Sequence, residues 1–209
     1  TAISVPTQII APTPDEDSLR STIISALMAL NTKQNKMENV TEIEGGKVNH
    51  SLIEFIPSDK KHIVSIEDEV EYIIISDDVY MKVGSSGAWE AAEIAASLFM
   101  GQGDVTEQTI GEMIRQVQFV RKDQLDGKAV NVVKYVEISK TENGEIESQV
   151  ELWIGEANGL PYKMIKDGKI YAVVNDPQTG ENKQEYVNAI TTTVFDFGAT
   201  FQIEAPMIK

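Results

Sequence analysis

Apolar and polar residues alternate with a period of two along most of this chain, and this pattern predicts a protein made mainly of β-strands. In residues 37–83 the alternating runs are separated by short breaks at Gly45–Gly46, at 57–60 and at Asp77–Asp78. A parallel crossover needs a dozen residues or more, so breaks this short predict an antiparallel meander. The alternation returns after Gln118 and continues almost to the C-terminus.

The second block of strands carries three two-residue turn signals, Asp126–Gly127, Asn143–Gly144 and Asp167–Gly168. Asn-Gly and Asp-Gly pairs supply the positive φ angles that type I′ turns require, so each pair predicts a hairpin. Residues 150–164 predict another hairpin, because one alternating run ends in the sequence Asn-Gly-Leu-Pro and a new run follows.

Helical spacing replaces the alternation near the N-terminus. Thr13, Pro14 and Glu16 place a capping hydroxyl, then a proline at the first helical position, then an acid at the third. Apolar residues follow at helical intervals, namely Leu19, Ile23, Leu27 and Leu30. We therefore expect a helix over residues 14–32 that packs one face against an apolar surface.

Two more helices are predicted between the two blocks of strands. Residues 89–100 are rich in alanine and read as helical, and Gly101 and Gly103 end this segment. Asp104 together with Glu107 caps the next helix, which we expect to extend to about residue 117.

The strand over residues 146–154 has one apolar and one polar face, as expected for a sheet that is covered on one side. Trp153 is the exception on the polar face, and we interpret it as a packing residue under a neighbouring loop. One long sheet with helices to cover its apolar face is an α+β architecture. Either a solid core or a core that encloses a ligand cavity would fit this pattern.

Composition narrows the class of protein. The 209 residues suit one domain, and the formal net charge of −15 disfavours nucleic acid and anionic membrane surfaces as partners. The absence of cysteine excludes disulfides and thiolate metal sites, and two histidines are too few for a zinc site unless carboxylates complete it. Residues 1–12 carry no charge and predict an extended linker or a frayed terminus, which leaves 13–209 as the domain.

Catalytic motifs are absent or weak. The sequence contains no phosphate-binding glycine loop and no G-x-S-x-G motif, and the Ser-Ser-Gly at 85–87 has no histidine near it. The threonines at 191–193 are interpreted first as a β-branched strand run and second as a hydrogen-bonding patch. We predict a protein that is not an enzyme and needs no cofactor or metal. Acids or histidines clustered in a pocket would reverse this prediction.

Several short strings occur in a recognisable order: VYMK at 79–82 before Trp89, WIG and GLPYKM at 153–155 and 159–164, then TVFDFG and IEAP at 193–198 and 203–206. In this order the chain resembles the lipoprotein-carrier superfamily, meaning LolA-like periplasmic carriers and, more closely, the LppX/LprG-type mycobacterial lipoproteins. Gly155 departs from the pattern, because an acid is common at that position.

The resemblance implies a curved antiparallel half-barrel sheet whose concave face is covered by helices, with a cavity for acyl chains between them. It also implies an exported cell-envelope protein, in the periplasm or on the outer face of the membrane. Such a protein would be lipid-anchored through a cysteine preceding residue 1, with 1–12 as the tether.

Our main hypothesis is therefore a monomer that holds a lipid or another hydrophobic ligand and opens by movement of the helical insert about Gly101 and Gly103. The expected lining residues are Leu27, Leu98, Phe99, Met113, Ile114, Val132, Val150, Leu152, Met164 and Phe195. The alternative is a sensor or protein-interaction domain of the same fold, similar to the RseB-type regulators, with Trp153 and the outer face as the contact surface.

Overall fold

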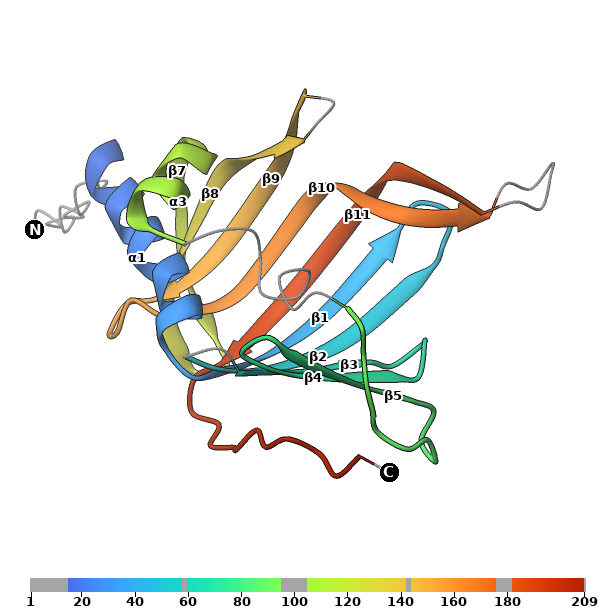
Figure 1. The fold of residues 1–209 in the computed structure, drawn as a ribbon. Helices are drawn as coiled ribbons and strands as arrows, with labels where there is room; N and C mark the ends of the chain where they lie inside the picture. Colours follow the sequence, from blue (N-terminus) through green and yellow to red (C-terminus); the bar gives the residue numbers. More distant parts are fainter. Residues whose placement is uncertain (1–14, 58–59, 95–104, 142–143, 176–181, 209) are drawn as a thin grey trace, which may run out of the picture.

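The computed structural model describes residues 15–57, 60–94, 105–141, 144–175 and 182–208 (Figure 1). The helices are α1 (Glu16–Thr32) and α3 (Glu107–Met113). The first block of strands comprises β1 (Asn35–Ile43), β2 (Val48–Ile56), β3 (Lys60–Ser65), β4 (Val70–Ile75), β5 (Asp78–Val83) and β6 (Glu90–Ala91). The second block comprises β7 (Ile114–Leu125), β8 (Lys128–Thr141), β9 (Gly144–Gly155), β10 (Pro161–Asn175) and β11 (Asn182–Asp196).

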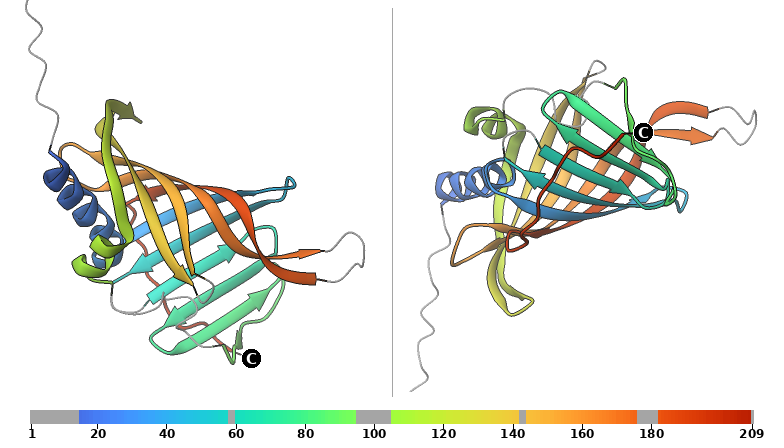
Figure 2. Two further views of the ribbon diagram at one scale, coloured as in Figure 1. Left: turned by 90° about the horizontal axis from the view of Figure 1, so that it is seen from above. Right: turned by 60° about the horizontal axis from the view of Figure 1, so that its bottom comes forward.

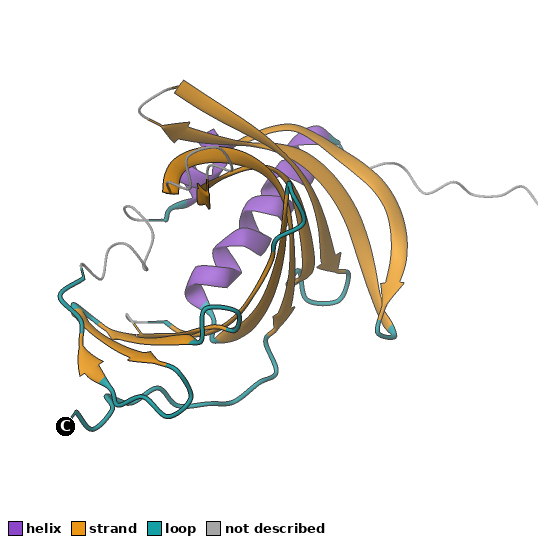
Figure 3. Cartoon of the chain, turned by 90° about the vertical axis from the view of Figure 1, so that its right-hand side faces the viewer, coloured by secondary structure: helices purple, strands orange, loops and turns teal. Residues whose placement is uncertain are grey.

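All of these strands belong to one 11-stranded sheet, in the order β6-β5-β4-β3-β2-β1-β11-β10-β9-β8-β7. Each block is an antiparallel meander, and the blocks join where β1 pairs with β11. The sheet is strongly curved, and both helices lie on its concave side (Figure 3). The predicted α+β half-barrel with helices on the concave face is therefore confirmed.

The N-terminus of α1 is capped by Asp15, whose carboxylate accepts a hydrogen bond from the backbone N–H of Ser18 at 2.9 Å. The cap is thus an acid two positions after Thr13, which lies outside the described residues. The predicted apolar face is confirmed, because one side of the helix buries Leu19, Ile23, Ala26 and Ala29.

The other end of α1 is fixed by a buried side chain from the first strand. The Asn35 amide donates to the carbonyl of Leu30 at 3.0 Å and to that of Lys33 at 2.8 Å. The last carbonyls of a helix have no partner within the helix, and Asn35 supplies a donor for two of the carbonyls at this end. This contact sets the direction in which the chain leaves α1 for β1.

The helix α3 is shorter than the sequence predicted. Thr106, not Asp104, is its N-cap, and the Thr106 and Thr109 side chains bond reciprocally to each other's backbone N–H. The helix ends at Met113, and Ile114 already begins β7. The residues after Met113 belong to β7, which pairs with β8. The prediction that the helix extends to about residue 117 was therefore wrong.

The predicted helix over 89–100 is also wrong in its described part. Glu90 and Ala91 form β6, which pairs with Met81 and Tyr80 of β5. The alanine-rich sequence favours a helix, but pairing with the edge strand β5 makes Glu90 and Ala91 a short strand instead. Residues 95–104, including the proposed hinge glycines, lie outside the described residues.

Two of the turn signals are confirmed by their backbone angles. Gly45 and Gly46 have φ of 98° and 90° between β1 and β2, and Asp126 and Gly127 have φ of 50° and 77° between β7 and β8. Gly144 has φ of 124° at the start of β9.

The Asp167–Gly168 turn was a wrong prediction, because both residues lie inside β10 and pair with β11, and Asp167 also pairs with Gln149 of β9. A Cβ on Gly168 would lie 2.1 Å from the Oγ of Ser148. Glycine therefore serves the close approach of β9 and β10 at this position, not a turn.

The edges of the sheet are short or irregular. At one edge, β6 has only two residues. At the other edge, β7 has register shifts between Arg115 and Gln118 and between Phe119 and Arg121, and Gln116 has φ of 54°. Short and bulged edges discourage pairing with other chains.

Candidate functional site

The concave face of the sheet is covered by helices over its second block. Here α1 and α3 pack on β7, β8 and β10. The core between them consists of Leu19, Ile23, Ala26, Ile110, Ile114, Val133, Tyr135, Val150, Leu152 and Ile154. The side chain of Arg20 joins the two helices, because it donates to the carbonyls of Gly111 and Ile114, at 2.7 Å in the second case.

Five of the predicted lining residues belong to this covered half. Ile114, Val150 and Leu152 are 1%, 2% and 0% exposed within the core, and Leu27 and Met164 pack against it. In this conformation they belong to the packed cluster between α1 and the sheet, so they form core rather than an accessible ligand surface.

Val132 lies on the opposite side of the sheet from the other predicted residues that the structure places on strands, namely Ile114, Val150, Leu152, Met164 and Phe195. It pairs with Trp153 and packs with Val130 on the convex face, whereas Val133 faces α1. The sequence could not separate these positions, because β8 is apolar on both faces and alternation is lost. Val132 therefore cannot line the concave side, and the prediction for this residue is corrected.

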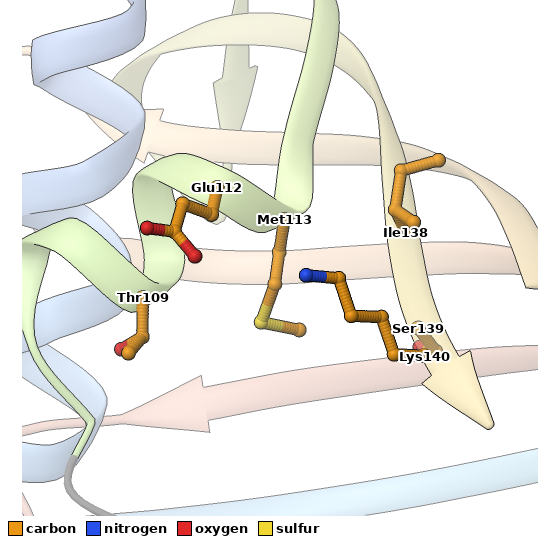
Figure 4. A pocket seen from close by; sticks show the side chains of 6 residues that line it. All are labelled: Thr109, Glu112, Met113, Ile138, Ser139 and Lys140. Atoms are coloured by element: carbon orange, nitrogen blue, oxygen red, sulfur yellow. The ribbon is translucent and has the colours of Figure 1, made fainter. Parts of the chain in front are cut away.

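Met113 is 39% exposed and lines a cleft of about 340 Å³ between α3 and the end of β8. The other lining residues are Thr109, Glu112, Ile138, Ser139 and Lys140 (Figure 4). The cleft thus mixes one thioether with an acid and a lysine. Leu98 and Phe99, also predicted to line the ligand site, lie outside the described residues.

The concave face of the first block carries a feature that the sequence interpretation missed. One register row crosses six strands and consists of Phe195, Met37, Ile53, Ile63, Tyr72 and Met81, in that order from β11 to β5. We call this the apolar row. Phe195, which was predicted to contact ligand, is 4% exposed at its inner end, and the other five side chains are partly exposed.

The signal for the apolar row was present in the sequence as alternation within each strand of the first meander. Alternation alone does not tell which of the two faces is concave. That information comes only from the pairing of β1 with β11, since it extends the face under α1 into the first block.

Two further register rows on the same face are polar. One contains Thr193, Asn39, Ser51 and Ser65, and the next contains Lys166, Thr191, Thr41 and Asn49. We call these eight residues the polar strip. Within it the Asn39 amide donates to Ser51 Oγ at 3.3 Å, and the hydroxyls of Thr41 and Thr191 bond at 3.1 Å.

The inner end of the polar strip meets the helix-covered core. Lys166 forms an ion pair with Glu137 there. Tyr135 is 1% exposed, and its hydroxyl has no hydrogen-bond partner among the described residues. Burial raises the pKa of Tyr135, and the negative charge of Glu137 raises it further, so the hydroxyl stays protonated.

On the convex face Trp153 is 7% exposed and packs with Val130 and Val132, which agrees with its interpretation as a packing residue. The charged ends of Arg121 and Lys163 lie 5.9 Å and 5.1 Å from its ring centre. Such cation–π contacts cover the ring and leave little of it for another protein.

Gly155 has a packing explanation. A Cβ at this position would lie 2.7 Å from Cε2 of Tyr162 and 2.5 Å from Oδ1 of Asn158. The Tyr162 ring in turn carries Lys128 Nζ at 4.2 Å from its centre. An acid at residue 155 would displace this arrangement.

A charge network also crosses the convex face of the first block. Glu54 bonds to Lys36 at 3.2 Å and to His62 at 3.1 Å. Burial raises the pKa of the Glu54 carboxyl, but the hydrogen bonds from His62 and Lys36 outweigh it, so the pKa lies below its usual value. The pKa of Glu71, which contacts Lys82 and His62, is lowered in the same way.

The C-terminal segment 197–208 runs along the convex side of the first block (Figure 2). Lys60 Nζ donates to the carbonyl of Ile203 at 3.1 Å, and Ile203 is 3% exposed.

Within the described part of the chain, no group of three or more acids or histidines is placed to hold a metal ion. No described helix is long and apolar enough to cross a membrane.

Comparison with known proteins gives a fold but no sequence relative: no family model and no curated protein matches the chain. The crystal structure of the Mycobacterium tuberculosis lipoprotein LppX matches with a TM-score of 0.59 at 10% identity, over 91% of this chain and 100% of LppX. LprF from Mycobacterium bovis matches with a TM-score of 0.54 at 11% identity, over 93% of this chain and 99% of LprF.

A third match is a chain of the Pseudomonas aeruginosa MucA/MucB complex, with a TM-score of 0.50 at 12% identity. It covers 88% of this chain but only 58% of the matched chain. The chain therefore has the fold of LppX and LprF, which confirms the resemblance at the level of the fold.

Proposed function

We propose that this protein is an exported, lipoprotein-type binding protein that holds the hydrophobic part of a lipid on the concave face of its half-barrel. The observation that carries the proposal is the apolar row, where apolar side chains from consecutive strands of the first block are partly exposed on the concave side. The likeness in fold to the lipoprotein LppX supports it.

The mechanism is burial of acyl surface against a curved, rigid wall. Six strands about 4.8 Å apart give the apolar row a length of roughly 24 Å, which suits a long acyl chain. Each methylene that leaves water contributes about 0.8 kcal/mol, so no specific polar contact to the chain is needed. The helix-covered half holds the sheet in its curved shape and forms one wall of the site.

In this proposal the protein acts outside the cytoplasm, at the cell envelope, as a monomer tethered through residues 1–12. Its acidic surface keeps it soluble between membranes while the lipid stays on the inner face. It performs no chemistry on the ligand and binds no nucleic acid.

The test is native mass spectrometry of protein purified gently from its own host, followed by organic extraction and lipid analysis. A bound lipid in one-to-one ratio is expected. A clean apo mass, together with no uptake of added lipids, would overturn the proposal.

A matched pair of variants locates the bound lipid. Ile63→Asp puts a charge in the middle of the apolar row and should abolish lipid retention while the far-UV circular dichroism stays unchanged. Ile190→Asp changes a residue that is 44% exposed on the convex face and should retain lipid. Equal retention by both variants would place the lipid elsewhere.

A protein-interaction domain is the second candidate, favoured by the likeness to a chain of the MucA/MucB complex. Ile190 and Val194, each 44% exposed on the outer face of β11, offer a contact surface, whereas Trp153 is covered. Capture of one defined membrane protein by lipid-free protein, lost in Val194→Asp, would support this candidate over lipid binding.

A further inference from the structure

The strands β10 and β11 extend beyond the rest of the sheet as a two-stranded arm. β9 pairs with β10 only as far as Asp167, and β1 pairs with β11 only from Ala189 onward. Residues 169–175 and 182–188 pair with each other, and no other strand of the described chain pairs with them. We call this ribbon the arm, and it projects from the body of the sheet (Figure 2). A two-stranded ribbon alone is only marginally stable, so a bound partner would stabilise the arm.

Exposed apolar side chains run from the arm along the convex face of β11. Tyr171 and Tyr186 lie directly opposite each other in the arm, with ring centres 5.0 Å apart, and are 59% and 38% exposed. Ile190 and Val194 follow on the same face of β11, and each is 44% exposed. We call these four residues the arm patch. Tyrosine is enriched at protein interfaces because its ring supplies a large apolar area while its hydroxyl stays hydrogen-bonded.

Carboxylates without a cationic partner among the described residues border the arm patch. Glu42 and Asp167 lie directly across from Ile190, one on each neighbouring strand, and both are exposed. Both line a shallow cleft of about 290 Å³ beside Ile190. Elsewhere on the convex face Glu54 is paired with Lys36, so unpaired acids are not a general property of this face. Two unpaired negative charges beside an apolar side chain favour an occupant that brings positive charge.

We propose that the arm patch docks a segment of a partner protein in which lysine or arginine side chains alternate with apolar ones. The apolar side chains of the segment pack on the tyrosine pair and on Ile190, while its cations pair with Glu42 and Asp167. An outer edge of the arm can add the segment as a further strand. The arm patch lies on the face opposite the apolar row, so docking does not depend on whether the protein holds lipid.

The test uses two short fluorescent peptides of equal length, one alternating lysine with leucine and the other alternating glutamate with leucine. Each is titrated with the full chain at low ionic strength, and binding is followed by fluorescence anisotropy. We expect the lysine peptide to bind about tenfold tighter or more, and its binding to weaken as salt is added. Equal affinities, or no binding of the lysine peptide, would overturn the proposal and leave lipid binding standing.

Two double variants separate the arm patch from the overall negative charge of the protein. Glu42→Gln combined with Asp167→Asn should weaken binding of the lysine peptide about fivefold or more. Glu16→Gln combined with Asp17→Asn removes the same charge at the exposed start of α1, at the other end of the molecule from the arm (Figure 1). This control should bind like the unmodified protein. An equal loss in both double variants would mean that net charge alone attracts the peptide, which would overturn the proposal.

Serine substitutions test the apolar part of the arm patch. Tyr171→Ser combined with Tyr186→Ser should weaken binding of the lysine peptide about tenfold or more. Ile190→Ser should also weaken it, and this residue is paired on both sides within the sheet, so the arm itself is left unchanged. Unchanged binding in both cases would overturn the proposal. Binding of the unmodified protein to phosphatidylcholine vesicles that is lost in the tyrosine variant would assign the arm patch to a bilayer and would also overturn it.

Discussion

Replacing Leu152 by alanine tests whether the helix-covered half is a solid core. Leu152 is 0% exposed, pairs with Val133 and Met164, and belongs to the core beneath α1. Truncation removes three carbon atoms from a site whose neighbours are held by the sheet. Truncations of this kind cost about 2–5 kcal/mol. For a domain of this length, that corresponds to a fall in Tm of roughly 5–15 °C.

The assay is urea unfolding of the lipid-free protein, followed by far-UV circular dichroism, with the midpoint and slope fitted separately. Ile63→Ala is the matched control, because Ile63 is partly exposed in the apolar row and should cost less than Leu152→Ala. A loss below about 1 kcal/mol for Leu152→Ala, with an unchanged slope, would refute the reasoning. It would mean that Leu152 already borders empty space and that the ligand cavity lies under α1.

Three further substitutions test individual contacts that stabilise the fold. Gly168→Ala should destabilise the protein, because the new Cβ would lie 2.7 Å from the Cβ of Ser148, and adding Ser148→Gly should recover part of the loss in thermal melts. Glu54→Gln should lower stability at pH 7, because the pKa of the Glu54 carboxyl is lower in the folded protein than its unfolded value near 4.5. A lowered carboxyl pKa stabilises the folded state at pH values above the unfolded pKa, and this stabilisation is lost as the pH falls through the folded pKa. The gap in urea midpoint between variant and parent should therefore narrow as the pH falls below 4.5, and a constant gap would reject this electrostatic account. Asn35→Ala should cost about 1–3 kcal/mol, because the last carbonyls of α1 lose their donor, and unchanged urea unfolding would show that water replaces it.

The architecture was predictable from the sequence because its main signals are local. Alternation identified the meanders, and the glycine pairs at 45–46 and 126–127 marked turns that need positive φ. The failures occurred where pairing overrides local preference. Gly168 looks like part of a turn but lets two strands approach, and Ile114 looks helical but begins an edge strand.

The candidate site was less predictable, because it depends on which face of each strand is concave. The ten residues expected to line it were chosen for apolarity, and several of them became core. The apolar row and the polar strip emerge only when the registers of β11, β1 and β2 are aligned. Their residues are individually ordinary, and only the alignment of rows across strands makes them a site.

The pairing of β1 with β11 also bears on how the chain reaches its folded state. Thr41 and Thr191 bond across this seam although they are 150 residues apart in the sequence. Contacts so distant carry a large loop-closure entropy and slow folding. Until the seam closes, each meander has an unpaired inner edge that can pair with another chain. Dilution, or a helper that shields the β1 and β11 edges, should therefore raise the yield of refolded protein.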